Sequence, residues 1–393
     1  MRRVLTILTA VVLMLASLGV GLFAADLPFW RRAFAWPPRP DGVYLPTVQI
    51  GAALEGAAAG ARETASLDPA VDAQIVEQAV ARARKAGSRA LLVMHRGRLQ
   101  IERYFGADDP ATLMPAGLVS RPLAAMTVGV ALAEGRIGSL DVPVARFLHE
   151  WEGEARGAIT VRQLLEDTSG LETGGDAHAL LDAYAWTEFA RLPRVATSRG
   201  VRLLIGNDFE SAALGFTLDH EPGGFHNVSP VNAQLIALIL ERATGMAFER
   251  YLDARVWRPA GAGIAELQLD RRAGMPAAHC CWRAGARDIV RIASLLVNDG
   301  MISGARVLPA GWAAEMGRPS RIDAAAGMQL QRSMIDNSPF LSARDVEGSA
   351  FWVAPTLGLV IVNIAGEGGG SEPDLPGLLL QAFNASADAA RPD

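Results

Sequence analysis

The sequence predicts an α+β protein in which one antiparallel sheet is flanked by helices and carries a helical subdomain. Two observations lead to this prediction. Paired apolar strands occur near both ends of the folded part, over residues 91–105 and 350–364. Several amphipathic stretches with helical periodicity lie between them. Since helices of this kind bury their apolar faces against a sheet or against each other, we expect the two hairpins to share one sheet and the helices between them to form the subdomain.

The strands are predicted as two hairpins. Residues 91–94 and 99–105 are apolar runs joined by a short polar turn, and residues 350–354 and 358–364 are joined by a segment that contains a proline. Residues 68–85, before the first hairpin, carry apolar side chains at spacings near four and therefore form a helix.

The helices of the middle part are recognised by their ends. A long helix over residues 121–134 is closed by Gly135, and Thr160 is a favourable residue to start a short helix at Val161. Ser169 and Gly170 are expected to terminate that short helix. The other helices are expected at residues 231–244, closed by Gly245, and at residues 288–296 and 377–383.

The N-terminus predicts a membrane segment. Residues 4–25 are 22 uncharged, mainly apolar residues that follow Arg2 and Arg3, and as a helix they would span about 33 Å. We expect residues 1–25 to be a signal anchor, or a signal peptide that is removed, and Trp30-Arg31-Arg32 to be an interfacial anchor. Residues 26–67 read as a tether and 68–388 as the main domain. The main domain is then exported to the cell envelope as a periplasmic domain, or secreted if the signal is cleaved.

The amino-acid composition limits the kinds of ligand and macromolecule that the protein is expected to bind. The net charge of −5 is spread along 393 residues without a basic block, which argues against nucleic acid. The only cysteines are the neighbours Cys280 and Cys281. They have no distant partner, and we expect two buried thiols rather than a disulfide between neighbours. The six histidines are scattered, so we expect no metal and no cofactor.

Six strings in the correct order resemble the β-lactamase-related serine hydrolases, a group that includes class C β-lactamases, penicillin-binding proteins and esterases. They cover about residues 70–385, and the resemblance implies a β-lactamase/transpeptidase-like fold. Fold alone does not establish activity. The strings are LLVMHRGRLQIERYFG, VGVALAEGRIGSLDVPVARFL, ITVRQLLEDTSGLETG, NAQLIALILERATGMAFERYL, ARDIVRIASLLVNDG and WVAPTLGLVIVNIAG.

The first catalytic motif of that family, Ser-x-x-Lys at the start of a long helix, is changed. The resemblance places Leu118 at the serine and Arg121 at the lysine. Leucine has no nucleophilic atom, and arginine stays protonated at every working pH, so it cannot act as a base. Lys85 is the chain's only lysine and is expected on a solvated helix surface.

The second and third motifs are changed as well. The family's Tyr-x-Asn or Tyr-x-Ser tyrosine aligns with Val228, or with Asn227 if the alignment slips by one residue. The third motif, Lys-Thr-Gly or His-x-Gly, aligns with Val346-Glu347-Gly348. Its glycine is kept and its cation is lost. We expect Leu118, Arg121, Val228 and Gly348 to converge on one cleft.

Three polar residues near these positions are candidates for a relocated site: Ser120 and Ser229 as nucleophiles and His226 as a base. Ser120 is expected to be a helix N-cap, where serine is favoured for structural reasons. Structural hydrogen bonding is the expected role of His226 and Ser229. Ser169 lacks the Gly-x-Ser-x-Gly context of a nucleophile elbow.

Three readings of the function follow. The leading one is an exported, membrane-anchored pseudoenzyme of the family that binds a small-molecule or cell-wall-related ligand, or a partner. The second is an active hydrolase or esterase with a relocated serine. The third is a structural protein of the envelope.

Overall fold

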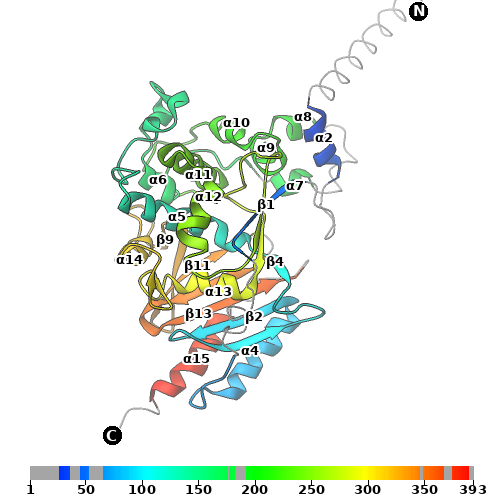
Figure 1. Cartoon of the computed structure of the whole chain (residues 1–393), viewed down its shortest axis with the longest axis vertical. Coiled ribbons are helices and arrows are strands. Elements are labelled where there is room, and N and C mark those ends of the chain that lie inside the picture. Colours follow the sequence, from blue (N-terminus) through cyan, green and yellow to red (C-terminus); the bar gives the residue numbers. More distant parts are fainter. Residues whose placement is uncertain are drawn as a thin grey trace, which may run out of the picture.

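The computed structural model describes residues 26–35, 45–52, 65–175, 177–181, 192–345, 348–366 and 374–388. Within these residues the larger sheet is antiparallel and has seven strands in the order β3-β2-β13-β12-β11-β10-β9. Strands from both ends of the chain lie side by side in it, as the sequence predicts (Figure 1). Its strands are β2 (Ser88–His95), β3 (Arg98–Tyr104), β9 (Ala326–Gly327), β10 (Leu330–Ile335), β11 (Ser338–Arg344), β12 (Ala350–Ala354) and β13 (Leu359–Ala365).

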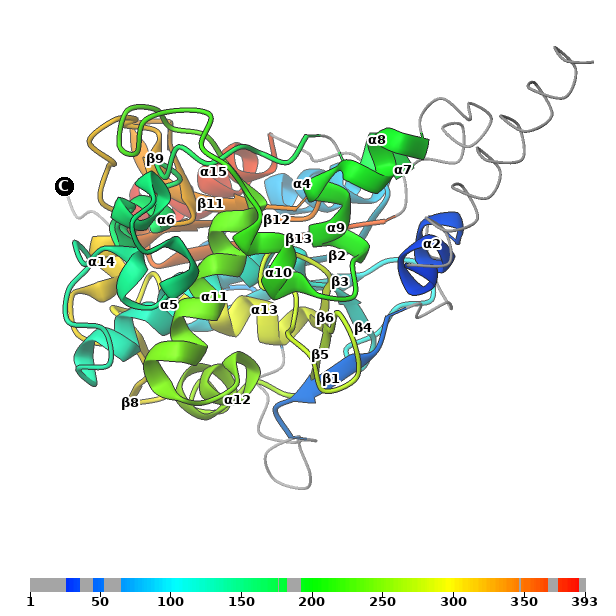
Figure 2. The same cartoon turned by 90° about the horizontal axis from the view of Figure 1, so that it is seen from above.

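Helices cover both faces of this sheet. On one face lie α4 (Ala73–Lys85) and α15 (Leu375–Asp388), which pack against each other over a core of their own. On the other face lie α13 (Ala286–Ser294) and α5 (Gly117–Ala133), and the helical subdomain stands beyond them (Figures 1 and 2). The main core fills the space between the sheet and these helices.

The helical subdomain is built around α11 (Pro230–Thr244), a mostly buried helix that packs on α5. Gly245 ends α11 in a left-handed conformation with φ of 69°, as the sequence predicts. Thr160 and Gln163 form a capping box at the start of α6. The other helices of this part are α6 (Val161–Leu165), α7 (Ala177–Leu181), α8 (Leu192–Thr197), α9 (Arg199–Ile205), α10 (Phe209–Leu214), α12 (Phe248–Leu252) and α14 (Trp312–Met316).

A second sheet was not foreseen from the sequence. Among the described residues it has four strands in the order β1-β5-β6-β4, formed by β1 (Thr47–Ile50), β4 (Leu113–Pro115), β5 (Ala265–Gln268) and β6 (Trp282–Gly285). Strand β4 runs directly into α5. A separate two-stranded ribbon joins β7 (Met301–Ile302) to β8 (Ala305–Arg306).

Parts of the expected tether are folded onto the domain. Strand β1 pairs with β5, and residues 27–34 form helix α2 (Leu27–Phe34), whose Phe29 and Trp30 are buried against α9. Arg32 donates hydrogen bonds to the backbone oxygens of Ile205, Gly206 and Asp270. Trp30 and Arg32 therefore hold α2 on the protein body, which differs from their expected role as an interfacial anchor.

The expected membrane segment, residues 1–25, lies outside the described residues and stays a prediction. In the part of the chain that the structure describes, no helix combines the length and apolar character needed to cross a bilayer.

Candidate functional site

The first turn of α5 is where the family's serine and lysine would stand. The helix begins at Gly117, four residues earlier than the sequence predicted, and the backbone N–H of Ala116 donates to the oxygen of Trp282 at 2.8 Å. Leu118 is 1% exposed and belongs to the main core. Its side chain is thus part of the packing of the protein and offers no group for covalent chemistry.

Arg121 is held by two side chains. Its Nε donates to Oε1 of Gln329 at 2.7 Å, and its Nη2 forms an ion pair with the carboxylate of Asp167. The Asp167 side chain is 5% exposed and that of Arg121 is 23% exposed. Since a buried carboxylate needs a partner, Arg121 compensates its charge.

Asp167 is the centre of a larger buried network. Its Oδ1 accepts hydrogen bonds from Nδ2 of Asn232 at 2.8 Å and from Nε2 of Gln329 at 3.2 Å. Asn232 in turn accepts a bond of 2.7 Å from the hydroxyl of Ser169. The network links α5, the loop after α6, the start of α11 and the residue before β10.

The second-motif segment meets the same network. The backbone N–H of Asn227 donates to the oxygen of Asp167 at 2.8 Å. Val228, at the family's tyrosine position, is 44% exposed and has no polar side-chain atom. Asp167 therefore joins the first-motif helix to the second-motif loop.

The third-motif segment also reaches the start of α5. A Cβ placed on Gly117 would lie 3.4 Å from Cβ and 3.7 Å from Oδ2 of Asp345. Asp345 is tied to the motif because its oxygen accepts from the N–H of Gly348 at 3.3 Å and its Oδ1 from the N–H of Ser349 at 2.9 Å. Gly348 has φ of 94°, which explains why this position keeps glycine. Val346 and Glu347 lie outside the described residues.

These contacts bring the three motif segments together around the first turns of α5. That Leu118, Arg121, Val228 and Gly348 line one open cleft stays a prediction. The carboxylate of Asp345 lies at the amino end of a helix that has no side-chain cap, and a negative charge is favourable there.

The candidates for a relocated site have other partners. The Ser120 hydroxyl donates to the oxygen of Gly117 at 2.7 Å, and the residue is fully buried. The expectation that Ser120 is an N-cap is wrong because the helix starts before it. The Ser229 hydroxyl donates to the oxygen of Glu172 at 2.8 Å. Nδ1 of His226 lies 3.1 Å from Oδ2 of Asp323.

Two further expectations concern Ser169 and Lys85. Helix α6 ends at Leu165, before Ser169, so Ser169 does not terminate it and instead belongs to the buried network around Asp167. Lys85 lies exposed in the last turn of α4, as the sequence predicts.

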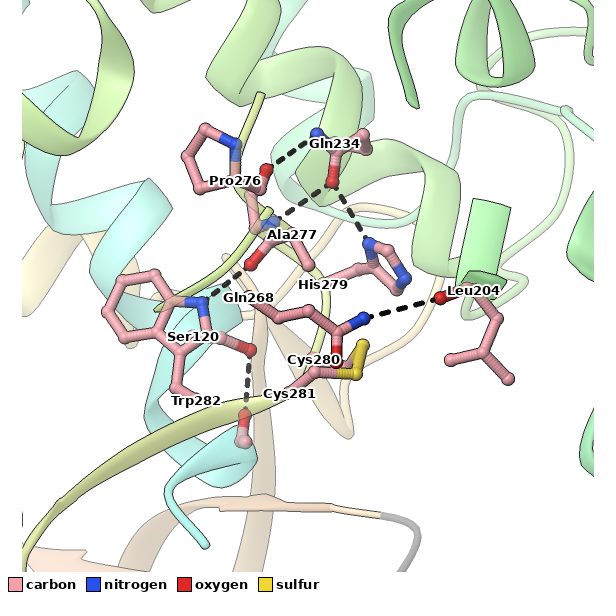
Figure 3. Close-up of a disulfide and its surroundings, with 12 residues drawn as sticks. Ser120, Leu204, Gln234, Gln268, Pro276, Ala277, His279, Cys280, Cys281 and Trp282 are labelled. Carbon is pink, nitrogen blue, oxygen red and sulfur yellow. Dashed lines mark hydrogen bonds between the residues drawn. A yellow bond between two sulfur atoms is a disulfide. The ribbon is translucent and has the colours of Figure 1, made fainter. Parts of the chain in front are cut away.

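The expectation of two thiols is also wrong. Cys280 and Cys281 form a disulfide with each other, with Cα atoms 3.8 Å apart. A disulfide between neighbours was not expected because it would be strained, but the turn at residues 280 and 281 brings the two sulfurs within bonding distance. Figure 3 shows this disulfide among residues that include Ser120, His279 and Trp282.

Sequence reasoning missed Asp167, Gln329, Asn232 and Asp345. For Asp167 the sequence offered one signal, because it follows a predicted helix and aspartate favours turns; for Gln329 the sequence offered none. Asp167 and Gln329 have φ of 54° and 55°, the left-handed region that a turn often uses.

Two known proteins of similar sequence carry the names of hydrolytic enzymes. The 6-aminohexanoate-dimer hydrolase of Paenarthrobacter ureafaciens is 27% identical over 234 residues, which are 57% of this chain and 55% of that protein. A D-aminopeptidase of Cereibacter sphaeroides is 30% identical over 168 residues, which are 42% of this chain and 28% of that enzyme. The chain thus spans about half or less of the length of these relatives.

A solved structure shares the fold. It is a Bacillus anthracis protein assigned as a 6-aminohexanoate-dimer hydrolase, with a TM-score of 0.68 and 18% identity over 89% of this chain and 92% of that one. The family model described as "Beta-lactamase" matches residues 73–376, which include α5, α11 and all seven strands of the larger sheet. This chain belongs to the β-lactamase family.

Proposed function

We propose that this chain is a family member that no longer uses serine–lysine acyl transfer and that binds a ligand or a partner where the three motif segments meet. One observation carries the proposal. Leu118 is packed into the core at the serine position, and Arg121 is ion-paired with Asp167 at the lysine position.

The chemistry supports this proposal. Acylation needs a hydroxyl whose proton is taken by a base, and general-base assistance is worth typically 10²–10⁴-fold in rate. Arg121 cannot take a proton. Its Nε and Nη2 are already engaged, and Val228 supplies no phenol. No single substitution at these positions restores the missing groups.

The position of Asp345 supports the proposal independently. Family enzymes stabilise the oxyanion of the acylation step with donors that include backbone N–H groups at the nucleophile. In this chain the carboxylate of Asp345 lies against the first turn of α5. A fixed negative charge there opposes the development of a second one.

The names of the relatives favour the second candidate, an active hydrolase or esterase with Ser120 or Ser229 as nucleophile. Against it stand the hydrogen bonds of both hydroxyls to backbone oxygens and the pairing of His226 with Asp323. Because these three side chains bond to other groups, a catalytic pair of either serine with His226 would require the loop around residue 226 to move.

For the cellular location we propose export with membrane anchoring through residues 4–25. The support is the length of the apolar run and its Arg2-Arg3 flank. Expression with a C-terminal tag, membrane fractionation and intact-mass measurement test this part. A soluble product that begins near Asp26 would show cleavage and secretion instead.

The decisive test of the lost chemistry is labelling with a fluorophosphonate and a penicillin probe, followed by mapping of the modified residue by mass spectrometry. We expect no labelling of the wild-type chain. The triple variant Leu118→Ser/Arg121→Lys/Val228→Tyr, checked for folding by circular dichroism, serves as the gain-of-function comparison. Stoichiometric labelling of Ser120 or Ser229 in the wild type, lost in Ser120→Ala or Ser229→Ala, would overturn the proposal.

The binding part has a separate test. The name of the D-aminopeptidase relative suggests a peptide with D-amino acids as the first probe, and D-alanyl-D-alanine represents the cell-wall class. We expect the melting temperature of the full chain to rise with dipeptide concentration and the rise to be smaller in Val228→Asp. Equal shifts in both proteins would place the dipeptide elsewhere, and no shift would exclude it as the ligand.

A further inference from the structure

The Cys280–Cys281 disulfide lies between two hydrophobic clusters. Both residues are half-buried, and both pack against the main core and against the smaller cluster that holds α2 and α9. They occupy the loop between β5 and β6, close to Ser120 of α5 (Figure 3). A half-buried disulfide can be reached by a thiol, which a fully buried one cannot.

The loop around the disulfide is fixed by other bonds. The side chain of Gln234, buried on α11, donates to the oxygen of Pro276 at 3.0 Å and accepts from the N–H of Ala278 at 2.9 Å. The indole of Trp282 donates to the oxygen of Ala277 (Figure 3). None of these bonds involves the sulfurs, so opening the S–S bond does not by itself remove them.

Cys281 lies beside the start of α5. It has φ of 68°, a left-handed conformation that is unfavourable for a residue with a Cβ. Its backbone nitrogen lies 3.8 Å from a Cβ placed on Gly117. The next residue, Trp282, accepts the hydrogen bond from the N–H of Ala116. A change of backbone conformation at Cys281 therefore acts on the turn that carries Leu118.

We propose that Cys280–Cys281 is a thiol–disulfide exchange site for dithiol reductants, and that its reduction loosens the first turn of α5. A thiolate of the reductant attacks one sulfur, which forms a mixed disulfide and releases the other cysteine as a thiolate that takes up a proton. The second thiol of the reductant then displaces the first cysteine. The protein gains two electrons and two protons, and the reductant leaves as a disulfide. The exchange chemistry does not rest on the proposed ligand function, although the turn that it loosens belongs to the segments proposed to bind the ligand.

The exchange is tested on the folded full chain in detergent. The protein is incubated with dithiothreitol mixtures of graded reduction potential, quenched with N-ethylmaleimide and weighed intact. We expect no alkylation without reductant and a single transition in which both cysteines become alkylated together. Alkylation without reductant would show two free thiols and overturn the proposal. Resistance of the native protein to reduction, with alkylation only after denaturation, would overturn it as well.

The effect on α5 is tested by hydrogen exchange of oxidised and reduced wild type. We expect at least a threefold faster exchange in peptides covering residues 113–120 and 278–285 after reduction, and unchanged exchange in residues 73–85 of α4, on the far face of the sheet. The variant Cys280→Ser/Cys281→Ser should match the reduced protein and not respond to dithiothreitol. Identical exchange in both redox states would exclude the coupling to α5.

Discussion

Arg121 of α5 and Asp167 of the loop after α6 form an ion pair at the position where the family's catalytic lysine would be. The pair lies in a network in which Asp167 also accepts from Asn232 and Gln329. A lysine base works by changing its protonation state, whereas this pair is useful because the arginine never does. The ion pair at this location thus stabilises the fold and fixes the motif segments relative to one another.

The ion pair predicts a large loss of stability when its acidic member is neutralised. Asp167→Asn leaves the guanidinium of Arg121 in a largely desolvated position without its counter-charge. We expect the free energy of unfolding to fall by about 3 kcal/mol, as is typical when one partner of a buried pair is removed. Urea denaturation followed by circular dichroism measures it.

The matched control is Asp374→Asn, which breaks the exposed pair with Arg82 and should cost under about 1 kcal/mol. Equal effects of the two substitutions would mean that the Arg121–Asp167 pair contributes no more than a surface pair.

A second prediction concerns the packing of α5. A Cβ on Gly129 would clash with Nε1 of Trp312, whose indole donates to the oxygen of Ala125 at 3.2 Å. Gly129→Ala should lower the free energy of unfolding by about 1–3 kcal/mol through overpacking, despite the higher helix propensity of alanine. Gly138→Ala, where nothing lies within 4 Å, should be nearly neutral in the same urea titration. A stabilised Gly129→Ala protein would contradict the packing of Trp312 on α5.

A third prediction concerns acid stability. Hydrogen bonds from Arg242 lower the pKa of Glu150 from 4.5 to about 2. A carboxyl group whose pKa is lower in the folded state stabilises the fold above pH 4.5, and this contribution is lost as the pH falls toward 2. In Glu150→Gln we therefore expect a shallower loss of stability across this window. The difference should stay below about 1 kcal/mol because the carboxylate is half exposed.

Glu241 is expected to change the pH dependence of stability in the opposite direction. Burial raises its pKa, so its ionised form destabilises the fold, and protonation on acidification relieves this effect. Glu241→Gln should raise stability at pH 7 and make the decline toward acid steeper. Urea midpoints at several pH values compare both variants, and the same pH slope for both would contradict this assignment.

The larger sheet was predictable where apolar strands alternate with clear turns. Strands β10 and β11 were missed although Asp336 and Asn337 stand between them, and both adopt positive φ in the structure. Asp and Asn favour such hairpin turns, so this signal was present in the sequence. The second sheet was less accessible because its strands are three or four residues long and come from three distant parts of the chain.

The sequence predicted which catalytic groups are missing from the site, but not which polar contacts stand in their place. Motif spacing placed Leu118, Arg121 and Val228 on segments that do meet. The partner of Arg121 could not be inferred, because Asp167 lies 46 residues away in a string that the family resemblance treats as structural. The disulfide was not expected because a bond between neighbouring cysteines would be strained, yet Cys280 and Cys281 form it.

The last prediction concerns the docking of α2, which the sequence assigned to a tether. Arg32 donates to three backbone oxygens of the body, while its neighbour Arg31 is exposed. Arg32→Ala leaves the oxygens of Ile205, Gly206 and Asp270 without these charged donors, each worth about 1.5–3 kcal/mol. Local opening of α2 should then become more frequent, and exchange of the amides in residues 27–35 should accelerate at least tenfold. Arg31→Ala is the matched control and should leave exchange unchanged. If both variants exchange like the wild type, the burial of Phe29 and Trp30 alone holds α2 in place. If exchange accelerates equally in both variants, the loss of a positive charge is the cause and the three hydrogen bonds are not.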